Sequence, residues 1–354
     1  MKIHEIIQLR LYNQLLTAKK FTSPGEAVSW FGAIQSQDFE GSKWAIGQRV
    51  EGSTETIIQQ AYDKGKIIRT HVMRPTWHFV SPADIKWLLA LTASRVTAAC
   101  ATTFRQVQLD NKIFKTSNAV IEKVLQKGKP LTRDELKTAL QKKNIRTDDI
   151  RMICLLMRAE LDGLICSGPK QDKQFTYMLL DERVPDSISF NKDEALAELT
   201  KRYFNSHGPA TIKDFAWWSG LTITDAKKGV ESIRSLLLNE KLEDEIFWFR
   251  SALPTIKTPK RNIQFLPAFD EYTVAYKNRH ILVHPSSASR SSMEILNPVI
   301  VQKGRVIGKW KRITDKKNVT IKITPFISIS QSAQKSIRTT AKSYAKFIGK
   351  KMIL

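Results

Sequence analysis

The chain has 354 residues, of which 42% are hydrophobic and 26% are charged, with 15 Gly and 13 Pro. This balance excludes a disordered or collagen-like chain, and the length allows two to four domains. Polar residues interrupt the apolar positions of residues 1–16, and no later apolar run is long enough to cross a bilayer. We therefore expect a cytoplasmic protein without a signal peptide or a membrane span.

Net charge is the strongest feature of the composition, because 57 Lys and Arg residues stand against 34 Asp and Glu residues and give +23. Residues 301–354 contain 14 of these cations and a single acid, Asp315, so +13 of the excess lies there. Such an excess favours a polyanionic partner, most often nucleic acid. A merely solvated basic surface, or an anionic membrane bound by a basic amphipathic helix in residues 332–351, remains an alternative.

Cysteine and histidine spacing gives no support for a metal centre. Cys100, Cys154 and Cys166 lie 54 and 12 residues apart, which fits neither a disulfide framework nor a zinc knuckle. We expect reduced, mostly buried thiols. The six histidines form no HExxH pair, and His71 and His78 lie seven residues apart in a predicted strand region. We predict neither a metal nor a cofactor.

The first hundred residues predict three helices followed by a β-hairpin. Apolar residues recur at helical spacing in residues 7–15, and Ser23-Pro24-Gly25-Glu26 matches a capping box that starts a second helix. That helix should end near Ile34, and another should span residues 53–62. The stretch "KIIRTHVMRPTWHFV" then predicts two strands around its Arg-Pro pair. This is the order of a winged helix.

The same order recurs in the second hundred residues. Helices are predicted over residues 116–127, 131–144 and 148–163, and "LICSG" with "QFTYMLL" supplies a hairpin. The recurrence concerns the pattern of elements and not the sequence itself.

A third copy begins at Lys192. The stretch "TIKDFAWWSGLTITDAKKGVESI" has helix-turn-helix grammar, with caps at Thr211 and Thr224 and with Trp217-Trp218 in the core. The following "EIFWFRSAL" is its predicted strand.

Beyond Pro259 the pattern changes to short alternating strands. These are "NIQFLPAF", "HILVH", "PVIVQKGRVIGKWKRI" with a turn at Lys303-Gly304, and "VTIKITPF". They predict a small β-barrel or sheet in which Lys309, Lys311 and Lys322 share a basic face. The predicted fold is mainly α with β, as three tandem winged helix-turn-helix domains (1–112, 113–190 and 191–258) followed by a basic β-barrel-like domain with a C-terminal helix (259–354).

Four stretches carry a resemblance to a known family: "GAIQSQDFEGSKWAIGQRV", "RTHVMRPTWHFVSPAD", "FLPAFDEYTVAYKNR" and "PVIVQKGRVIGKW". Their order resembles that of the bacterial winged-helix DNA glycosylases of the AlkZ and YcaQ type, over essentially the whole chain. The resemblance implies three winged-helix domains and a β-barrel around a DNA-binding channel. It also implies monofunctional removal of N-alkylated purines, including bases in interstrand crosslinks.

The family's catalytic signature is a Gln, a variable residue, and then Gln or Asp, which Gln35 and Gln37 match. Ser36 departs mildly from the apolar or small residue usual between them. Neither Gln titrates near neutral pH, so the pair can act only by positioning. An N7-alkylated guanine already carries a positive charge, and the remaining task is to stabilise an oxocarbenium-like sugar and to hold a water. We hypothesise that Gln35 and Gln37 share that water.

Local geometry constrains this hypothesis. Residues i and i+2 are about 200° apart on a helix but share a face of an extended segment, so the helix must end before Gln35. Ordinary C-capping and solvent exposure of two amides is the alternative. A tethered, crosslinked base cannot travel far, so we expect an open groove shared by the first winged helix and the barrel.

Weaker candidates surround the pair. Asp38 either supplies a carboxylate or caps the next helix. The predicted first wing offers DNA contacts or core packing, and the barrel hairpin offers phosphate contacts or a solvated charged face. The predicted DNA-binding residues are Arg74, Trp77, His78, Lys303, Arg305, Lys309 and Lys311. Asp270 and Arg279 match family positions, as a structural Asp-Arg pair or as auxiliary catalytic residues.

The predicted function is a monofunctional DNA glycosylase that hydrolyses the N-glycosidic bond of N-alkylated purines in double-stranded DNA. We expect it to be monomeric, cytoplasmic and associated with the nucleoid. The main alternative is a non-catalytic winged-helix DNA-binding protein or transcriptional regulator. A third reading is a basic protein that binds membrane or RNA through its C-terminal segment.

Overall fold

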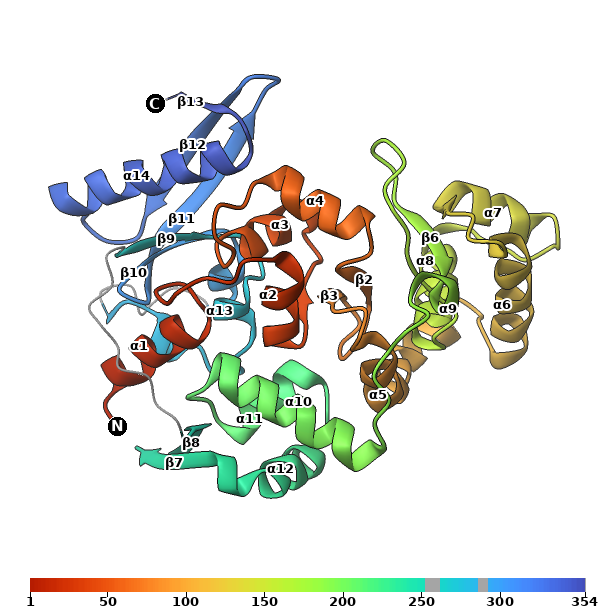
Figure 1. The fold of residues 1–354 in the computed structure, drawn as a ribbon, viewed down its shortest axis with the longest axis horizontal. Coiled ribbons are helices and arrows are strands. Elements are labelled where there is room, and N and C mark those ends of the chain that lie inside the picture. The colour runs from red at the N-terminus through yellow and green to blue at the C-terminus, as the bar shows by residue number, and fades with distance from the viewer. Residues whose placement is uncertain (252–261, 286–291, 354) are drawn as a thin grey trace. The chain divides into compact units, whose positions relative to one another are not determined.

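The computed structural model describes residues 1–251, 262–285 and 292–353 (Figure 1). The chain divides into two compact units. The first unit holds residues 1–59, 197–218 and 222–354, and the second holds residues 60–196 and 219–221. Across the described ranges, none of the helices combines the length and the apolar character needed to cross a membrane.

The N-terminal part of the first unit is helical. Its elements are α1 (Ile3–Asn13), α2 (Pro24–Phe31), the short strand β1 (Ile34–Gln35), α3 (Phe39–Gly47) and α4 (Glu55–Asp63), which continues into the second unit. The predicted capping box at α2 is confirmed, because the Ser23 hydroxyl accepts from the Glu26 backbone N–H at 3.3 Å and Glu26 accepts in return. The helix ends at Phe31, earlier than predicted, because Gly32 takes a φ of 78° and turns the chain.

Helix α3 was not among the predicted elements. Seven consecutive residues from Gly41 to Gly47 are buried, so the helix lacks the one-sided apolar pattern that identifies a surface helix. Its glycines permit close packing: a Cβ on Gly47 would lie 2.4 Å from the Phe347 ring.

The third predicted group of helices is present and is followed by a hairpin. Its elements are α10 (Lys192–His207), α11 (Ile212–Ser219), α12 (Ile223–Ser232), the 3-10 turn η1 (Arg234–Leu236), β7 (Leu237–Leu242) and β8 (Glu245–Arg250). Helix α10 begins in the second unit. The Thr211 cap is confirmed by its hydrogen bond from the Asp214 backbone N–H at 3.1 Å. The Thr224 cap is wrong: Thr222 caps α12, because Asp225 stands three residues after it and completes a capping box. The last residues of the predicted strand lie outside the described ranges.

The tryptophan pair of α11 is only half in the core. Trp218 is fully buried, but Trp217 is 43% exposed, because adjacent helical positions point about 100° apart.

The C-terminal part of the first unit is a five-stranded sheet in the order β13-β12-β11-β10-β9. Its elements are β9 (Ile263–Leu266), α13 (Glu271–Val274), η2 (His280–Leu282), η4 (Ser292–Leu296), β10 (Val299–Gln302), β11 (Arg305–Thr314), β12 (Asn318–Pro325), α14 (Gln331–Phe347) and β13 (Lys351–Ile353). The sheet is open, with β9 and β13 as its edges. In the stretch "HILVH", residues His280–Leu282 form a 3-10 helix and not a strand, because the Asn278 side chain accepts from the His280 backbone N–H and starts a turn. Val283 makes an isolated bridge to Val306.

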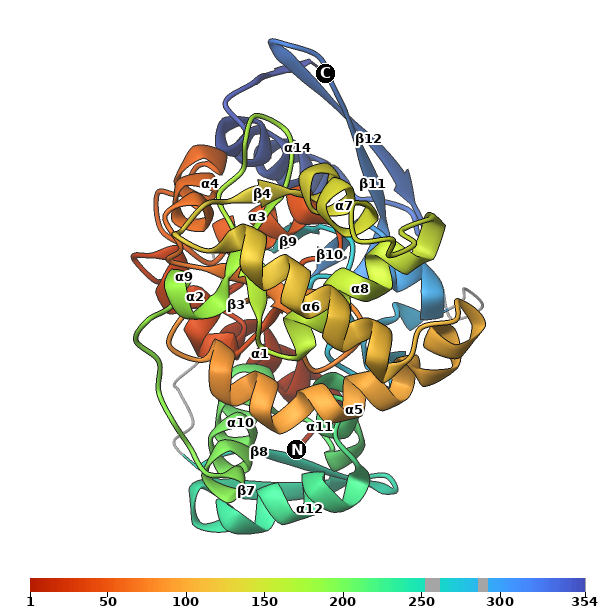
Figure 2. The ribbon, with the colours of Figure 1, turned by 90° about the vertical axis from the view of Figure 1, so that its right-hand side faces the viewer.

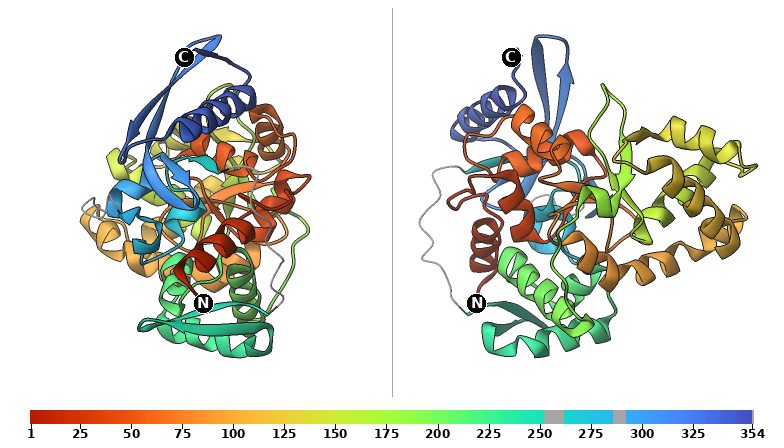
Figure 3. Two further views of the ribbon diagram at one scale, coloured as in Figure 1. Left: turned by 90° about the vertical axis from the view of Figure 1, so that its left-hand side faces the viewer. Right: turned by 45° about the vertical axis from the view of Figure 1, so that its right-hand side comes forward.

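Strands β11 and β12 form a long hairpin (Figure 3). Its two faces carry different side chains. On one face Trp310 packs against Tyr344 of α14 with ring centroids 5.0 Å apart, and the Arg312 guanidinium donates to the Tyr344 hydroxyl at 2.6 Å. Strand periodicity places Lys309 and Lys311 on the opposite face, where Lys311 is directly opposite Lys322. The sequence alternation predicted this grouping.

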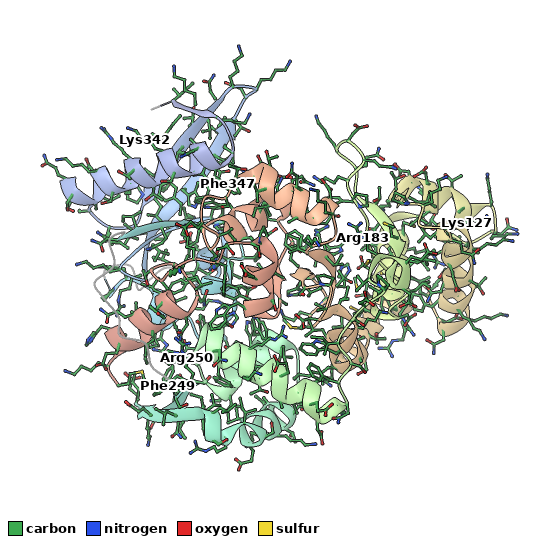
Figure 4. All side chains as sticks on the ribbon, viewed as in Figure 1. Lys127, Arg183, Phe249, Arg250, Lys342 and Phe347 are labelled. Atoms are coloured by element: carbon green, nitrogen blue, oxygen red, sulfur yellow. The ribbon has the colours of Figure 1, made fainter. Side chains whose placement is uncertain are left out.

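Helix α14 is tied to α3 through its C-terminal end (Figure 4). Phe347 is buried against the Trp44 indole, at a centroid distance of 5.0 Å, whereas Lys342 is exposed. The Trp44 indole N–H donates to the Phe265 carbonyl at 2.7 Å, which fastens α3 to strand β9.

The second unit (Figure 2) contains β2 (Ile68–His71), β3 (Trp77–Val80), α5 (Ile85–Gln106), α6 (Asn111–Leu125), β4 (Leu131–Thr132), α7 (Arg133–Gln141), α8 (Asp149–Leu161), β5 (Ile165–Ser167), β6 (Thr176–Leu179) and α9 (Leu180–Arg183). The predicted hairpins appear as β2–β3 and, within the sheet β4-β6-β5, as β5–β6. Cys100, Cys154 and Cys166 are buried free thiols, and burial raises the pKa of each.

Helices followed by a hairpin thus recur along a mixed α and β chain. The assignment of three winged-helix domains with the boundaries given above stays a prediction.

The turn between β10 and β11 yields a stability test. Gly304 has a φ of 79°, and a Cβ there would lie 2.1 Å from Ile7 Cγ2, whereas Gly52 has a φ of 62° and nothing within 4 Å. Both Gly→Ala variants force alanine into the left-handed region, so the conformational cost cancels in the comparison. We expect Gly304→Ala to lower the free energy of unfolding by about 1–3 kcal/mol more than Gly52→Ala, measured by urea denaturation. Equal losses would show that the close approach to α1 does not constrain the turn.

Candidate active site

The Gln35-Ser36-Gln37 segment leaves α2 and enters α3 without belonging to either helix. Gln35 is in β1, and the backbone bends at Gln37 and Asp38 before α3 begins at Phe39. Gln35 is 7% exposed, Ser36 is fully buried and Gln37 is exposed. Neither Gln lies in mid-helix, so the arrangement that would exclude a shared water is not present, and the shared water stays a prediction.

A buried carboxylate fixes the backbone of this segment. The Gln35 backbone N–H donates to Glu271 Oε1 at 2.8 Å, and the Trp218 indole N–H donates to Glu271 Oε2 at 2.9 Å. Glu271 is fully buried at the start of α13. The Gln35 backbone is thus fixed. Among the described residues, Gln35 Oε1 is buried and has no hydrogen-bond partner.

His207 completes the environment of Glu271. Its Nε2 lies 3.3 Å from Glu271 Oε2, and its Nδ1 lies 2.8 Å from the Ser206 hydroxyl. Burial lowers the pKa of His207, although the hydrogen bond to Glu271 opposes the shift. The Ser206 hydroxyl in turn donates to the Arg202 carbonyl at 2.6 Å. This Ser-His-Glu chain resembles a hydrolytic triad in composition, but all three residues are fully buried, so it serves to position neighbours.

Asp270, beside Glu271, forms a second buried ion pair. Its carboxylate receives two hydrogen bonds of 2.8 Å from the Arg49 guanidinium, and both residues are 1% exposed. The predicted pairing of Asp270 with Arg279 is wrong. Arg279 instead donates to the Thr273 carbonyl at 2.8 Å and lies over the Trp217 ring at 5.5 Å. Arg279 is close to Asp270 in sequence whereas Arg49 is 221 residues away, so sequence proximity favoured the wrong arginine.

Asp38 caps the next helix, which was the structural alternative to a catalytic role. It is the N-cap of α3, and its side chain accepts from the Gly41 backbone N–H at 3.0 Å. This contact fixes the point at which the Gln segment ends.

The candidate residues of the first wing lie in the second unit. His78 is fully buried and bonds to the Thr76 carbonyl at 2.9 Å and to Arg74 at 3.3 Å. Trp77 is partly exposed, between the His71 ring at 4.4 Å and the Arg69 guanidinium at 4.5 Å. His78 is therefore a core residue of the hairpin and not a surface residue available to DNA. Trp77 packs against two neighbouring side chains and is also partly exposed.

The four cations predicted to contact phosphate from the C-terminal sheet have different surroundings. Arg305 donates to the Val283 carbonyl at 2.8 Å, and Lys309 pairs with Glu294 at 3.0 Å. Lys303 in the turn and Lys311 on β11 are exposed.

No group of three or more metal-ligating side chains occurs within the described parts of the chain. An open cavity of about 1110 Å³ in the first unit is lined by residues of β12, the chain after it and α14, with His284, and Gln35 and Gln37 are not among its lining residues.

Comparison with known proteins gives the family. The model described as "DNA glycosylase AlkZ-like" matches residues 28–347. The chain belongs to this family. DNA glycosylases are hydrolases that act on N-glycosyl bonds, so the chain belongs to a family of enzymes and the predicted resemblance is confirmed.

Two relatives from Streptomyces sahachiroi support the assignment. An interstrand DNA cross-link repair glycosylase is 24% identical over 387 residues, covering 98% of this chain and 96% of that protein. The solved structure of DNA glycosylase AlkZ covers 100% of both chains with a TM-score of 0.78 at 20% identity. This second likeness shows that the fold is shared.

Sequence reasoning missed Glu271, His207 and Trp218 as neighbours of Gln35. The signals were present in part, since Glu271 follows Asp270 in "FDEY" and Trp218 lies in a recognised helix. Only the folded chain brings the three together, because 236 residues separate Gln35 from Glu271.

The buried state of His207 predicts a pH dependence of stability. Because its folded-state pKa is lowered, the unfolded chain binds one more proton than the folded chain between that pKa and the usual value of about 6.5. Stability is therefore lost as pH falls through this window. In His207→Gln, which keeps a donor and an acceptor but does not titrate, the slope of unfolding free energy against pH should decrease by up to about 1.4 kcal/mol per pH unit. Urea titrations from pH 5 to pH 8 measure both slopes, and identical slopes would contradict the assignment.

Proposed function

We propose that this chain removes N-alkylated purines of the 7-alkylguanine type from double-stranded DNA, and that it unhooks interstrand crosslinks. The observation that carries the proposal is the Gln35-Ser36-Gln37 segment, whose backbone is held by buried Glu271 and whose Gln35 side-chain oxygen is unpaired among the described residues. The name of the 24% identical relative supports the crosslink as substrate.

The chemistry suits neutral amides. A purine alkylated at N7 carries a positive charge, so its glycosidic bond is weakened and its departure needs no strong acid. The transition state develops positive charge on the sugar, and a carbonyl dipole aimed there stabilises it. His207, which contacts Glu271, is not suited to supply a proton, because it is fully buried and burial lowers its pKa.

The two amides have different surroundings, so we propose separate roles for them in place of a shared water. Gln35 Oε1 accepts a hydrogen bond from the attacking water, because this oxygen is buried and its backbone is fixed. Gln37 is exposed at the bend and reaches the substrate. A water held close to the reacting carbon has lost its translational and rotational freedom before it attacks. The entropic part of the activation barrier is therefore smaller.

DNA binding, in this proposal, uses the basic face of the β11–β12 hairpin. Lys311 and Lys322 are directly opposite each other in an exposed part of the sheet, which suits contact with successive phosphates. Three winged-helix domains and a monomeric state complete the proposed arrangement. An exclusively DNA-binding protein is the second candidate, favoured by the helix-turn-helix arrangement of α11 and α12.

The first test is release of 7-methylguanine from methylated duplex DNA. We expect Gln37→Ala to lower the single-turnover rate about 100-fold or more while DNA affinity is retained, and Gln35→Ala to lower it similarly. Gln8→Ala is the matched control, because it removes an exposed amide from α1 of the same unit. Binding without release by the wild type, on methylated and crosslinked duplexes alike, would favour the non-catalytic protein.

The second test concerns the basic face. Removing two phosphate contacts with Lys311→Ala/Lys322→Ala should weaken DNA binding and reduce the slope of log affinity against log salt by roughly 1.8. The control, Lys342→Ala/Lys346→Ala, removes two exposed lysines of α14 and the same charge. Equal effects of the two double variants would mean that general charge, and not the hairpin face, governs affinity.

A further inference from the structure

The second unit contains a cavity of about 340 Å³, at the lower end of the range for small-molecule sites. Strands β2 and β3, helices α7 and α8, and the β5–β6 hairpin contribute to it. Its lining residues are Arg69, Trp77, Arg133, Asp134, Ile153, Leu156, Lys173, Gln174, Phe175 and Tyr177. Gln35 and Gln37 are not among them, so the cavity is a separate feature from the proposed active site.

The inner wall is aromatic and cationic. The Arg69 guanidinium lies 4.5 Å from the centroid of the Trp77 ring and 4.9 Å from that of Phe175, so two aromatic rings hold it. Arg69 is 8% exposed, and its backbone N–H donates to the Ser167 hydroxyl at 2.8 Å. Burial lowers the pKa of Arg69, but arginine remains charged in proteins. A guanidinium held in this way presents a fixed set of donors.

The rim is also basic. Arg133 and Asp134 are exposed on the first turn of α7, and Lys173 is exposed on the β5–β6 hairpin. Three cations therefore face one carboxylate around the cavity. This excess disfavours a cationic ligand, and a 7-alkylated purine is cationic, so the cavity is unsuited to the damaged base.

We propose that this cavity binds one unpaired, unmodified nucleotide of the DNA, with the base against Phe175 and Tyr177 and the phosphate between Arg133 and Lys173. Aromatic faces combined with cations are the pattern by which proteins hold single nucleotides out of a stack. In this arrangement the Tyr177 hydroxyl, a lining group of the cavity, donates a hydrogen bond to the base. The inference rests on the proposed function in one respect, namely that the substrate is DNA.

The choice of a nucleotide over a free anion follows from the lining. Ile153, Leu156 and the aromatic side chains give the cavity an apolar interior, which inorganic phosphate would not use. The polar Gln174 and Asp134 supply an amide and an acceptor for a base edge.

The test uses the full chain and a duplex that contains a single unpaired 2-aminopurine, compared with the same duplex fully paired. The wild type should bind the unpaired duplex more tightly and change the fluorescence of its 2-aminopurine. Phe175→Ala should reduce this preference roughly 5- to 150-fold. Arg133→Ala/Lys173→Ala alters only exposed side chains, so it tests the rim without disturbing the core.

The matched control is Lys112→Ala/Lys115→Ala, two exposed lysines of α6 in the same unit that do not line the cavity. Retention of the preference in the control and its loss in both cavity variants would support the inference. Absence of any preference in the wild type, or its survival in the cavity variants, would overturn it. Loss of the preference on adding inorganic phosphate at constant ionic strength would reassign the cavity to a free anion.

Base release from methylated DNA, measured in parallel, separates the two proposals. If release fails while the preference for the unpaired nucleotide stands, the proposed reaction is wrong and the cavity assignment holds. If release depends on Gln37 but the preference is absent, the cavity assignment is wrong and the reaction holds.

Discussion

The buried carboxylate of Glu271 is the constraint on which the candidate site depends. A carboxylate removed from water is costly unless hydrogen bonds compensate it, and here the Gln35 backbone, the Trp218 indole and His207 provide them. Gln35 is distant in sequence from the other two donors, which lie in the successive helices α10 and α11. The charge therefore forces the start of the Gln segment, α11 and the end of α10 to meet at α13, and it fixes the backbone of Gln35 more firmly than a two-residue strand alone would.

The adjacent Arg49–Asp270 pair constrains the position of α3 in the same way. Its two 2.8 Å hydrogen bonds join the end of that helix to the residue before Glu271. Burial of such a pair adds little net stability, because desolvation offsets much of the attraction. Its value lies in specificity, since either charge left alone in this core would be strongly destabilising. Two successive acidic residues thus fix both ends of the chain segment that carries Gln35 and Gln37.

The sequence predicted what local rules determine. The Ser23–Glu26 capping box, the Lys303-Gly304 turn and the alternation of Lys309 and Lys311 each depend on a few neighbouring residues. Tertiary contacts decided the rest. Helix α3 is buried on most sides and shows no amphipathic pattern, and the partner of Asp270 is 221 residues away. The candidate site was proposed from its motif, and the carboxylate that contacts it could be identified only from the fold.

The distribution of charge suits a substrate in which a positively charged alkylated purine lies within negatively charged DNA. The exposed lysines of the β11–β12 hairpin and the cations around the cavity of the second unit attract phosphate, whereas the Gln segment itself is neutral. A strongly basic group beside the lesion would repel an alkylated purine and oppose the developing sugar cation. The same side chains therefore cannot serve both tasks. In the proposed function, a protein that binds DNA through an overall charge of +23 keeps the residues beside the lesion uncharged, which is the property that two glutamines provide.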